Sequence, residues 1–324
     1  MSTKRKRGAK AAAANAPKQL VREHARCLHR EREAVAAFVR AAWNSPAASS
    51  VMLSDRKAVS VGVSPETCRA RDVLLDRSAR LCGLLVPSVV NHIAAIEECL
   101  SAGTVPQYAP MTLARAVLDA AVQFCFLTDC DTDASTRLIR SAAVLLDSAR
   151  EEVTAARHMR QSVVPGIVGD TAEAQKELEA QISSVGIEIR KPDKGRVTLC
   201  WPNGRPVNLG VSVTAEQEKY IPDVEASYRV GSGASHAMEW MLHDPSDEPA
   251  RIYLACGAAD LALAALSAVA DRAGQYTGHD AASECDRIAD LRKALGARIL
   301  TLFASGFRSI PRYADKPRLA GPPG

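Results

Sequence analysis

Hydrophobic residues recur every three or four positions along most of this chain. That spacing places them on one face of an α-helix, with charged residues on the other. It predicts helices over residues 17–43, 64–85, 88–103, 110–127, 133–159, 170–185, 214–242 with an interruption at Pro222, 249–276 and 280–305. We therefore predict a mainly α protein, a multi-helix bundle of about nine helices.

One segment, residues 187–211, follows a different pattern. Its apolar residues alternate with polar ones, and two turn signals, Pro192 to Gly195 and Asn203-Gly204, divide it. Alternation of this kind predicts β-strands joined by tight turns. The segment is therefore expected to form a small β-meander of two or three strands inserted into the helical protein. Residues 44–63 are aperiodic and are expected to form a loop.

Charge divides the chain into a body and two basic ends. Residues 1–16 are expected to be a disordered basic tail, residues 17–306 a helical domain, and residues 307–324 a basic tail rich in proline and glycine. The first 19 residues hold six basic side chains and no acidic one. Such an end can contact nucleic acid by displacing counterions, or it can simply keep the protein soluble.

Composition limits the class of protein. The chain is 47% hydrophobic but only 4% aromatic, which suits closely packed helices rich in alanine, leucine and valine. Its nine cysteines are scattered without a Cys-x-x-Cys pair, as expected of a reduced, cytoplasmic protein. No secretory signal is recognisable, and no uninterrupted apolar run reaches the roughly 18 residues of a membrane span. We expect no membrane contact and no cofactor.

The candidate chemistry is an arginine followed seven positions later by a histidine. Arg229 and His236 are separated by a segment that contains Gly231 and Gly233. On a continuous helix the two side chains would face the same way, whereas the glycines also permit a bend. A histidine can move the proton of a ribose hydroxyl near neutral pH, and an arginine can stabilise the charged phosphate that follows. This pair predicts RNA cleavage.

In an all-α bundle, this pair resembles the signature of the HEPN superfamily: an arginine, four to six intervening residues and a histidine. Here six residues intervene. The upstream run Leu113 to Ala120, followed by Arg137 and Arg140, is also similar to uncharacterised bacterial helical proteins. The resemblance covers about Val89 to Gly274. It implies a dimeric, metal-independent endoribonuclease of a toxin or antiviral defence type, with RNA and a second copy of the chain as partners.

This chain departs from the family at two points. Val230 follows the arginine where many active members have a polar residue, and two long predicted helices come after the motif. The resemblance implies Arg229 and His236 as catalytic residues, with Tyr228 and Ser232 in support. Arg115 and Asp119 could support the pair from another helix, or they could form a simple ion pair four residues apart.

Two alternatives to catalysis remain open. Arg229 could pair with an acidic residue and His236 could be structural, which would make the protein a non-catalytic helical scaffold that binds a protein or nucleic-acid partner. The predicted meander offers a second nucleic-acid candidate, because basic residues surround one aromatic side chain that could stack on a base. These residues are Arg190, Lys191, Lys194, Arg196, Trp201 and Arg205. A plain solvated insertion explains the same pattern.

No metal site is expected. His24, Cys27 and Glu31 share one helical face, but their spacing matches no zinc motif, and a charged amphipathic helix explains all three. Glycine-rich phosphate loops and the serine-hydrolase and zinc-protease motifs are also missing from the sequence.

Overall fold

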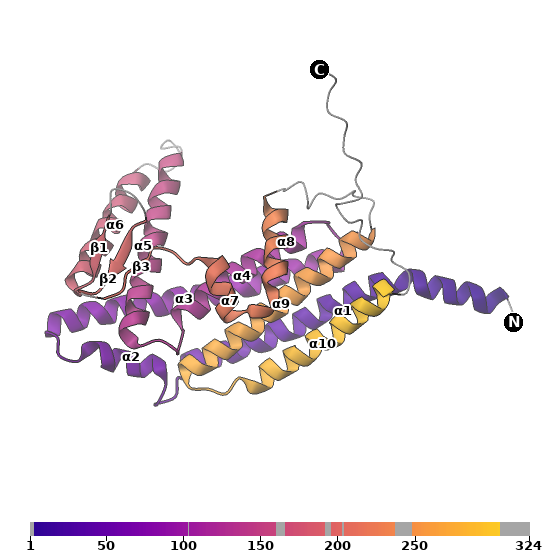
Figure 1. Ribbon diagram of the computed structural model, residues 1–324, viewed down its shortest axis with the longest axis horizontal. Helices are drawn as coiled ribbons and strands as arrows, with labels where there is room; N and C mark the ends of the chain where they lie inside the picture. Colours follow the sequence, from indigo (N-terminus) through magenta and orange to yellow (C-terminus); the bar gives the residue numbers. More distant parts are fainter. Residues whose placement is uncertain are drawn as a thin grey trace, which may run out of the picture.

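The computed structural model describes residues 3–102, 104–159, 166–191, 196–202, 204–236 and 248–304. Within these ranges the protein is mainly α, with ten α-helices, one short 3₁₀ helix and a three-stranded antiparallel sheet (Figure 1). The helices are α1 (Thr3–Asn44), α2 (Val51–Ser60), α3 (Pro65–Ser101), α4 (Ala109–Leu127), α5 (Ala134–His158), α6 (Ile167–Ser184), α7 (Val213–Tyr220), α8 (Glu225–Ser235), α9 (Glu248–Thr277) and α10 (Ala282–Ala304). The predicted fold class is confirmed.

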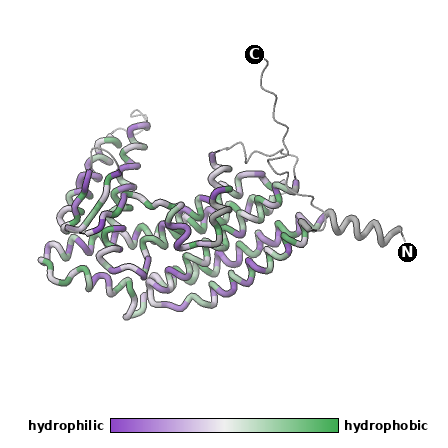
Figure 2. The backbone as a smooth tube through the Cα atoms, viewed as in Figure 1, coloured by the Kyte–Doolittle hydropathy of each residue, from purple (hydrophilic) through white to green (hydrophobic). Residues whose placement is uncertain are grey.

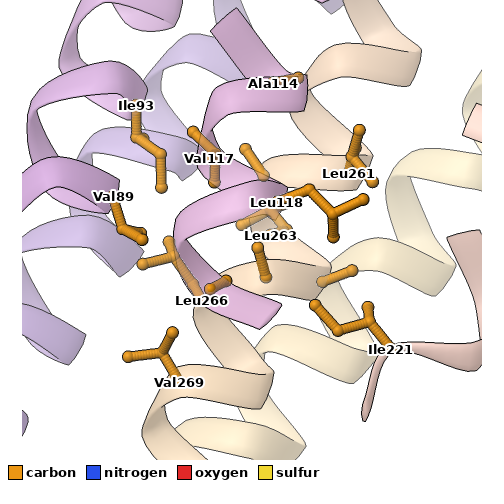
Figure 3. Close-up of a cluster of buried hydrophobic side chains, with 14 of the residues drawn as sticks. Val89, Ile93, Ala114, Val117, Leu118, Ile221, Leu261, Leu263, Leu266 and Val269 are labelled. Atoms are coloured by element: carbon orange, nitrogen blue, oxygen red, sulfur yellow. The ribbon is translucent and has the colours of Figure 1, made fainter. Parts of the chain in front are cut away.

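A long helical bundle forms most of the molecule. Helix α4 packs between α3 and α9, while α1 contacts α3, α9 and α10. Along these helices hydrophobic and hydrophilic residues alternate in bands, so each helix turns one face inward (Figure 2). Figure 3 shows the inward faces of α3, α4 and α9 meeting, with Val117, Leu118 and Leu263 among the fully buried side chains. Burial of these apolar surfaces stabilises the bundle.

A smaller lobe stands at one end of the bundle and holds the predicted meander (Figure 1). Its three strands, β1 (Glu188–Arg190), β2 (Thr198–Cys200) and β3 (Val207–Asn208), pair in chain order and pack against α5 and α6. Leu199 of β2 lies opposite Ile189 and Val207 and is fully buried. This lobe has its own hydrophobic cluster, in which Leu138, Leu146 and Ile182 take part.

Helix α3 joins the two hydrophobic clusters and corrects the prediction of two separate helices. The sequence predicted a break at Pro87, but α3 continues through it. Its first half buries Leu74 and Leu75 in the small lobe, and its second half buries Ile93 and Ile96 in the bundle. Packing at both ends holds the helix together despite the hydrogen bond that a proline removes.

Two further differences concern helices α2 and α1. Helix α2 lies in the segment predicted to be a loop, and the side chain of Ser50 caps its first turn by accepting a hydrogen bond from the Leu53 backbone N–H. Helix α1 begins at Thr3 and so runs through most of the tail predicted to be disordered, where Ala11 to Ala14 favour helix. The predicted extension of α8 to Leu242 and the tail at 307–324 lie outside the described residues.

By length and composition alone, three helices could cross a membrane: α3, α4 and the part of α9 from Ala250 to Thr277. The sequence prediction of no such span relied on uninterrupted apolar runs and did not anticipate them. In α4 and α9 most of the apolar stretch is buried inside the protein, where the two helices pack against each other. Core packing therefore accounts for the apolar character of α4 and α9.

Candidate functional site

The candidate arginine and histidine lie on one continuous helix. Gly231 and Gly233 sit inside α8, so of the two geometries that the sequence allowed, the structure has the helix and not the bend. Arg229 is exposed in its middle, and His236, also exposed, follows its last residue with nearly helical backbone angles. Seven residues correspond to two turns, so the two positions share a face about 10 Å apart along the axis.

The opposite face of α8 is held against the bundle. Gly231 is buried, and a Cβ atom built at this position would lie 3.2 Å from the backbone oxygen of Met111 and 3.3 Å from the Cβ of Arg115. Val230 and Ala234 pack against the main hydrophobic cluster. The close approach of α8 to α4 thus depends on a glycine, and it leaves Arg229 and His236 facing outward on a supported helix.

Arg115 and Asp119 form the simple ion pair that the sequence allowed. Their side chains approach to 3.6 Å across one turn of α4. Burial raises the pKa of the Asp119 carboxyl above its ordinary value, although the charge of Arg115 opposes this effect. Because Arg115 also lies beside Gly231, the pair sits directly under α8. It is placed to support the helix that carries Arg229 and His236.

The remaining two support candidates also belong to α8. Ser232 is half-buried, one turn beyond Arg229. The side chain of Tyr228 lies outside the described part of the structure.

Three of the meander residues, Arg190, Lys191 and Trp201, have separate contacts of their own in the described structure. Arg190 pairs with Glu188 at 2.9 Å, and Lys191 pairs with Glu179 at 2.8 Å. Trp201 packs against the small-lobe cluster, donates a hydrogen bond to the backbone oxygen of Ser135, and carries the guanidinium of Arg71 over its ring at 5.1 Å.

The other meander residues are not all placed by the structure. Arg196 and Arg205 are exposed, whereas Lys194 lies outside the described residues. Since Trp201 anchors the sheet to α5, the geometry favours a structural role for its ring over base stacking.

A buried polar cluster around Asp129 was not anticipated from the sequence. The carboxylate of Asp129, fully buried in the loop between α4 and α5, accepts hydrogen bonds from Arg140 at 2.9 Å, from Tyr220 at 3.0 Å and from Lys219. Arg272 of α9 lies 3.6 Å away. Burial alone would raise the pKa of Asp129, but these donors hold it well below its ordinary value.

A second buried ion pair adjoins this cluster. Arg137 of α5 donates two hydrogen bonds, of 2.6 and 2.7 Å, to the carboxylate of Asp55 in α2. The same guanidinium donates to the backbone oxygen of Asp129 at 2.8 Å. The sequence signal for the first cluster was an acidic residue, Asp129, directly after the apolar α4, which is where a buried carboxylate needs partners. Asp55 lies in a short mixed segment and has no such signal. Spacing alone does not identify partners about 80 or 90 residues away.

A wide cavity of about 660 Å³ opens beside α8, between α9 and α10. Val230 and Met111 line one side of it, and the partly exposed Tyr253 and Leu300 line the rim. Its main polar feature is the ion pair between Asp260 and Arg292, which is joined by two hydrogen bonds of 2.8 and 3.0 Å. The lining is therefore mostly apolar, with this ion pair and the exposed Lys293 as its charged residues.

The residues considered as metal ligands in the sequence have other partners. His24 is buried in α1 and bonds through Nδ1 to the backbone oxygen of Leu20, and Glu31 pairs with Arg30 and Arg287. Within the described ranges, no three histidine, cysteine or acidic side chains come together in a group that could hold a metal ion. All nine cysteines are free thiols.

A scan against protein-family models, a search of curated proteins and a search of solved structures found no match to this chain.

Proposed function

We propose that the chain is a HEPN-like helical protein that binds RNA and cleaves it without a metal ion. The observation that carries this proposal is the placement of Arg229 and His236, both exposed on one face of a continuous helix. A buried histidine facing away from the arginine would have been incompatible with it. The packing of Gly231 on α4 supports the proposal further, because it holds this face in a fixed position.

In the proposed reaction, the imidazole of His236 accepts the proton of a ribose 2′-hydroxyl, and the 2′-oxygen forms a bond to the neighbouring phosphorus. Arg229, which remains charged, stabilises the negative charge that builds up on the phosphate oxygens. The bond from phosphorus to the 5′-oxygen then breaks, and the imidazolium returns its proton to that oxygen. The products are a 2′,3′-cyclic phosphate and a 5′-hydroxyl end.

A homodimer and a cytoplasmic location form part of the same proposal. The resemblance to HEPN proteins is the basis for the dimer, in which two exposed α8 faces would supply two arginine and histidine pairs to one RNA. The location remains a prediction from the free cysteines and the sequence.

The test is RNA cleavage by the full chain in the presence of a chelator, with Arg229→Ala and His236→Ala variants beside the native protein. Each substitution is expected to lower the cleavage rate by at least 100-fold, which is on the order of what a general acid/base or a charge-stabilising group contributes. Arg157→Ala and His158→Ala are matched controls, because both residues are exposed at the end of α5. Cleavage that survives both α8 substitutions would exclude this site.

The second candidate function is a non-catalytic scaffold that binds a protein partner. The cavity between α9 and α10 favours it, because apolar side chains with Tyr253 and Leu300 at the rim are typical of a surface that accepts another apolar group. If the native chain cleaves no RNA in the assay above, this alternative becomes the better account. It predicts that Leu300→Asp abolishes capture of a partner while leaving the fold intact.

A further inference from the structure

A second surface, far from α8 in the sequence, carries a row of basic side chains. Two adjoining cavities of about 200 and 430 Å³ lie beside α1 and have Arg22 in common. We call this surface the basic furrow and define it by the four polar α1 residues on its wall, namely Lys18, Arg22, Arg26 and His29. The ends of α3 and α9 form its other walls, where Arg251 of α9 also lies.

Lys18, Arg22 and Arg26 are exposed, and among the described residues none of the three has an ion pair or a hydrogen bond. The neighbouring acidic residues of α1 form ion pairs with other arginines. On α1 itself, Glu23 pairs with Arg298 and Glu31 pairs with Arg30 and Arg287.

The acidic side chains that line the furrow are Glu97 and Glu248. Glu97 accepts two hydrogen bonds from Arg32, at 2.7 and 3.2 Å, and also contacts His29 at 3.2 Å. Glu248 is exposed at the start of α9. Among the described lining residues the basic side chains outnumber these two acidic ones, so this part of the furrow has a net positive charge.

The spacing of these charges fits a linear polyanion. Lys18, Arg22 and Arg26 follow one another every fourth residue, so they lie on one face of α1 about 6 Å apart along its axis. Helix α1 continues past the end of the bundle toward the N-terminus (Figure 1). The sequence of that extension contains no acidic residue and five basic ones, Lys4, Arg5, Lys6, Arg7 and Lys10.

The walls of the furrow indicate the kind of contact. Apolar side chains of Val21, Leu100, Val105 and Ile252 lie between the charges, and none of the described lining residues is aromatic. Contacts to phosphates therefore dominate, and these are independent of base sequence. A recess also fits a strand better than the flat surface of a bilayer.

We infer that the basic furrow binds the phosphodiester backbone of a nucleic acid. This inference is independent of the proposed function, since it involves none of the α8 residues and holds whether or not the chain cleaves RNA.

The test measures binding of the full chain to a fluorescent single-stranded RNA and to a DNA duplex over a range of salt concentrations. Lys18→Ala/Arg22→Ala/Arg26→Ala is compared with the native chain. The triple variant is expected to bind at least tenfold more weakly. For the single strand, the slope of log K against log salt concentration is expected to be less negative by about 2 in the triple variant, because three phosphate contacts are lost. The relative affinities for the two probes tell which form the furrow prefers.

The matched control is Lys57→Ala/Arg77→Ala/Arg80→Ala, which removes the same charge from exposed positions on α2 and α3. Circular dichroism verifies that both variants fold. Equal loss of binding in the two variants would attribute the effect to net charge and overturn the inference. Unchanged binding in the furrow variant would overturn the inference too. The inference would also be overturned if the native chain bound vesicles of anionic lipid but neither the RNA nor the DNA probe.

Discussion

Asp129 shows how strongly one buried carboxylate can constrain this fold. It receives hydrogen bonds from α5 and α7 and lies close to Arg272 of α9, so one side chain ties three helices to the loop after α4. Removal of the negative charge would leave several cationic groups facing one another in a buried place. We expect Asp129→Asn to lower the free energy of unfolding by about 3–5 kcal/mol in urea denaturation. Asp131→Asn, at an exposed position in the same loop, should cost less than about 1 kcal/mol.

The same comparison gives a pH dependence with a definite sign. The donors around Asp129 hold its pKa below the unfolded value of about 3.9. The contribution of its carboxylate to the free energy of unfolding is therefore fully present above about pH 5 and is lost as the pH falls. The difference in unfolding free energy between native protein and Asp129→Asn should therefore be constant from pH 7 to 5 and shrink below about pH 4. A difference that grows on acidification would contradict the assigned ion pairs.

Gly231 permits the contact between α8 and α4. A methyl group at this position would meet a backbone oxygen that cannot move without distorting α4. Gly231→Ala is expected to destabilise the protein by about 1–3 kcal/mol, measured by chemical denaturation. Gly83→Ala in α3 is the control, since a Cβ there meets nothing within 4 Å, and it should stabilise the helix by about 0.5–1 kcal/mol. Equal effects of the two substitutions would show that the close packing of α8 is not important.

At the level of single elements, the sequence predicted those that bury a regular stripe. Helices α4, α5, α9 and α10 lie close to their predicted ranges because each has apolar residues at helical spacing over several turns. The meander was predicted from alternation and turn residues. Helix α2 was missed because it has only ten residues, and tertiary contacts, above all the Asp55–Arg137 pair, hold it in place.

In α3 the sequence made the opposite error, because it predicted a break that the structure does not have. A proline is a strong local signal, but the packing of α3 in two hydrophobic clusters outweighs it. Long-range packing of this kind leaves no trace in a local pattern.

Helix α2 provides a test of an element held by one buried ion pair. Both oxygens of Asp55 accept hydrogen bonds from Arg137, and both side chains are nearly inaccessible to solvent. Asp55→Asn is expected to cost about 3–5 kcal/mol and to speed hydrogen exchange in α2 more than in α4. Asp76→Asn, which removes an exposed partner of Arg56, should change stability by less than about 1 kcal/mol. Slow exchange in α2 of the Asp55 variant would show that other contacts hold the helix.

The candidate site could be predicted only in part. The spacing of Arg229 and His236 implied a shared helical face, and the structure has such a helix with both residues exposed. The pairing of Arg115 with Asp119 also followed from spacing. The position of that pair beneath Gly231 could not be predicted, because α4 and α8 are about 110 residues apart in sequence. The role of Trp201 as an anchor to α5 depends on tertiary contacts of the same kind.

For the whole molecule, two hydrophobic clusters share one continuous helix, and buried ion pairs lie where the lobes meet. The two surfaces that we propose to act on RNA are the outer face of α8, where Arg229 and His236 are exposed, and the basic furrow along α1. They belong to different helices and can be altered separately. A protein that both holds and cleaves RNA would use the furrow for affinity and α8 for chemistry.

The measurement that tests the proposed ribonuclease most directly compares an RNA with a DNA strand of the same base sequence, incubated with the full chain in chelator. The mechanism needs a 2′-hydroxyl, so we predict that the RNA is cut to fragments ending in 2′,3′-cyclic phosphate while the DNA stays intact. An Arg229→Ala/His236→Ala variant should leave both strands intact. If the DNA is cut as fast as the RNA, or the native chain leaves the RNA as intact as the double variant does, the proposed activity is contradicted.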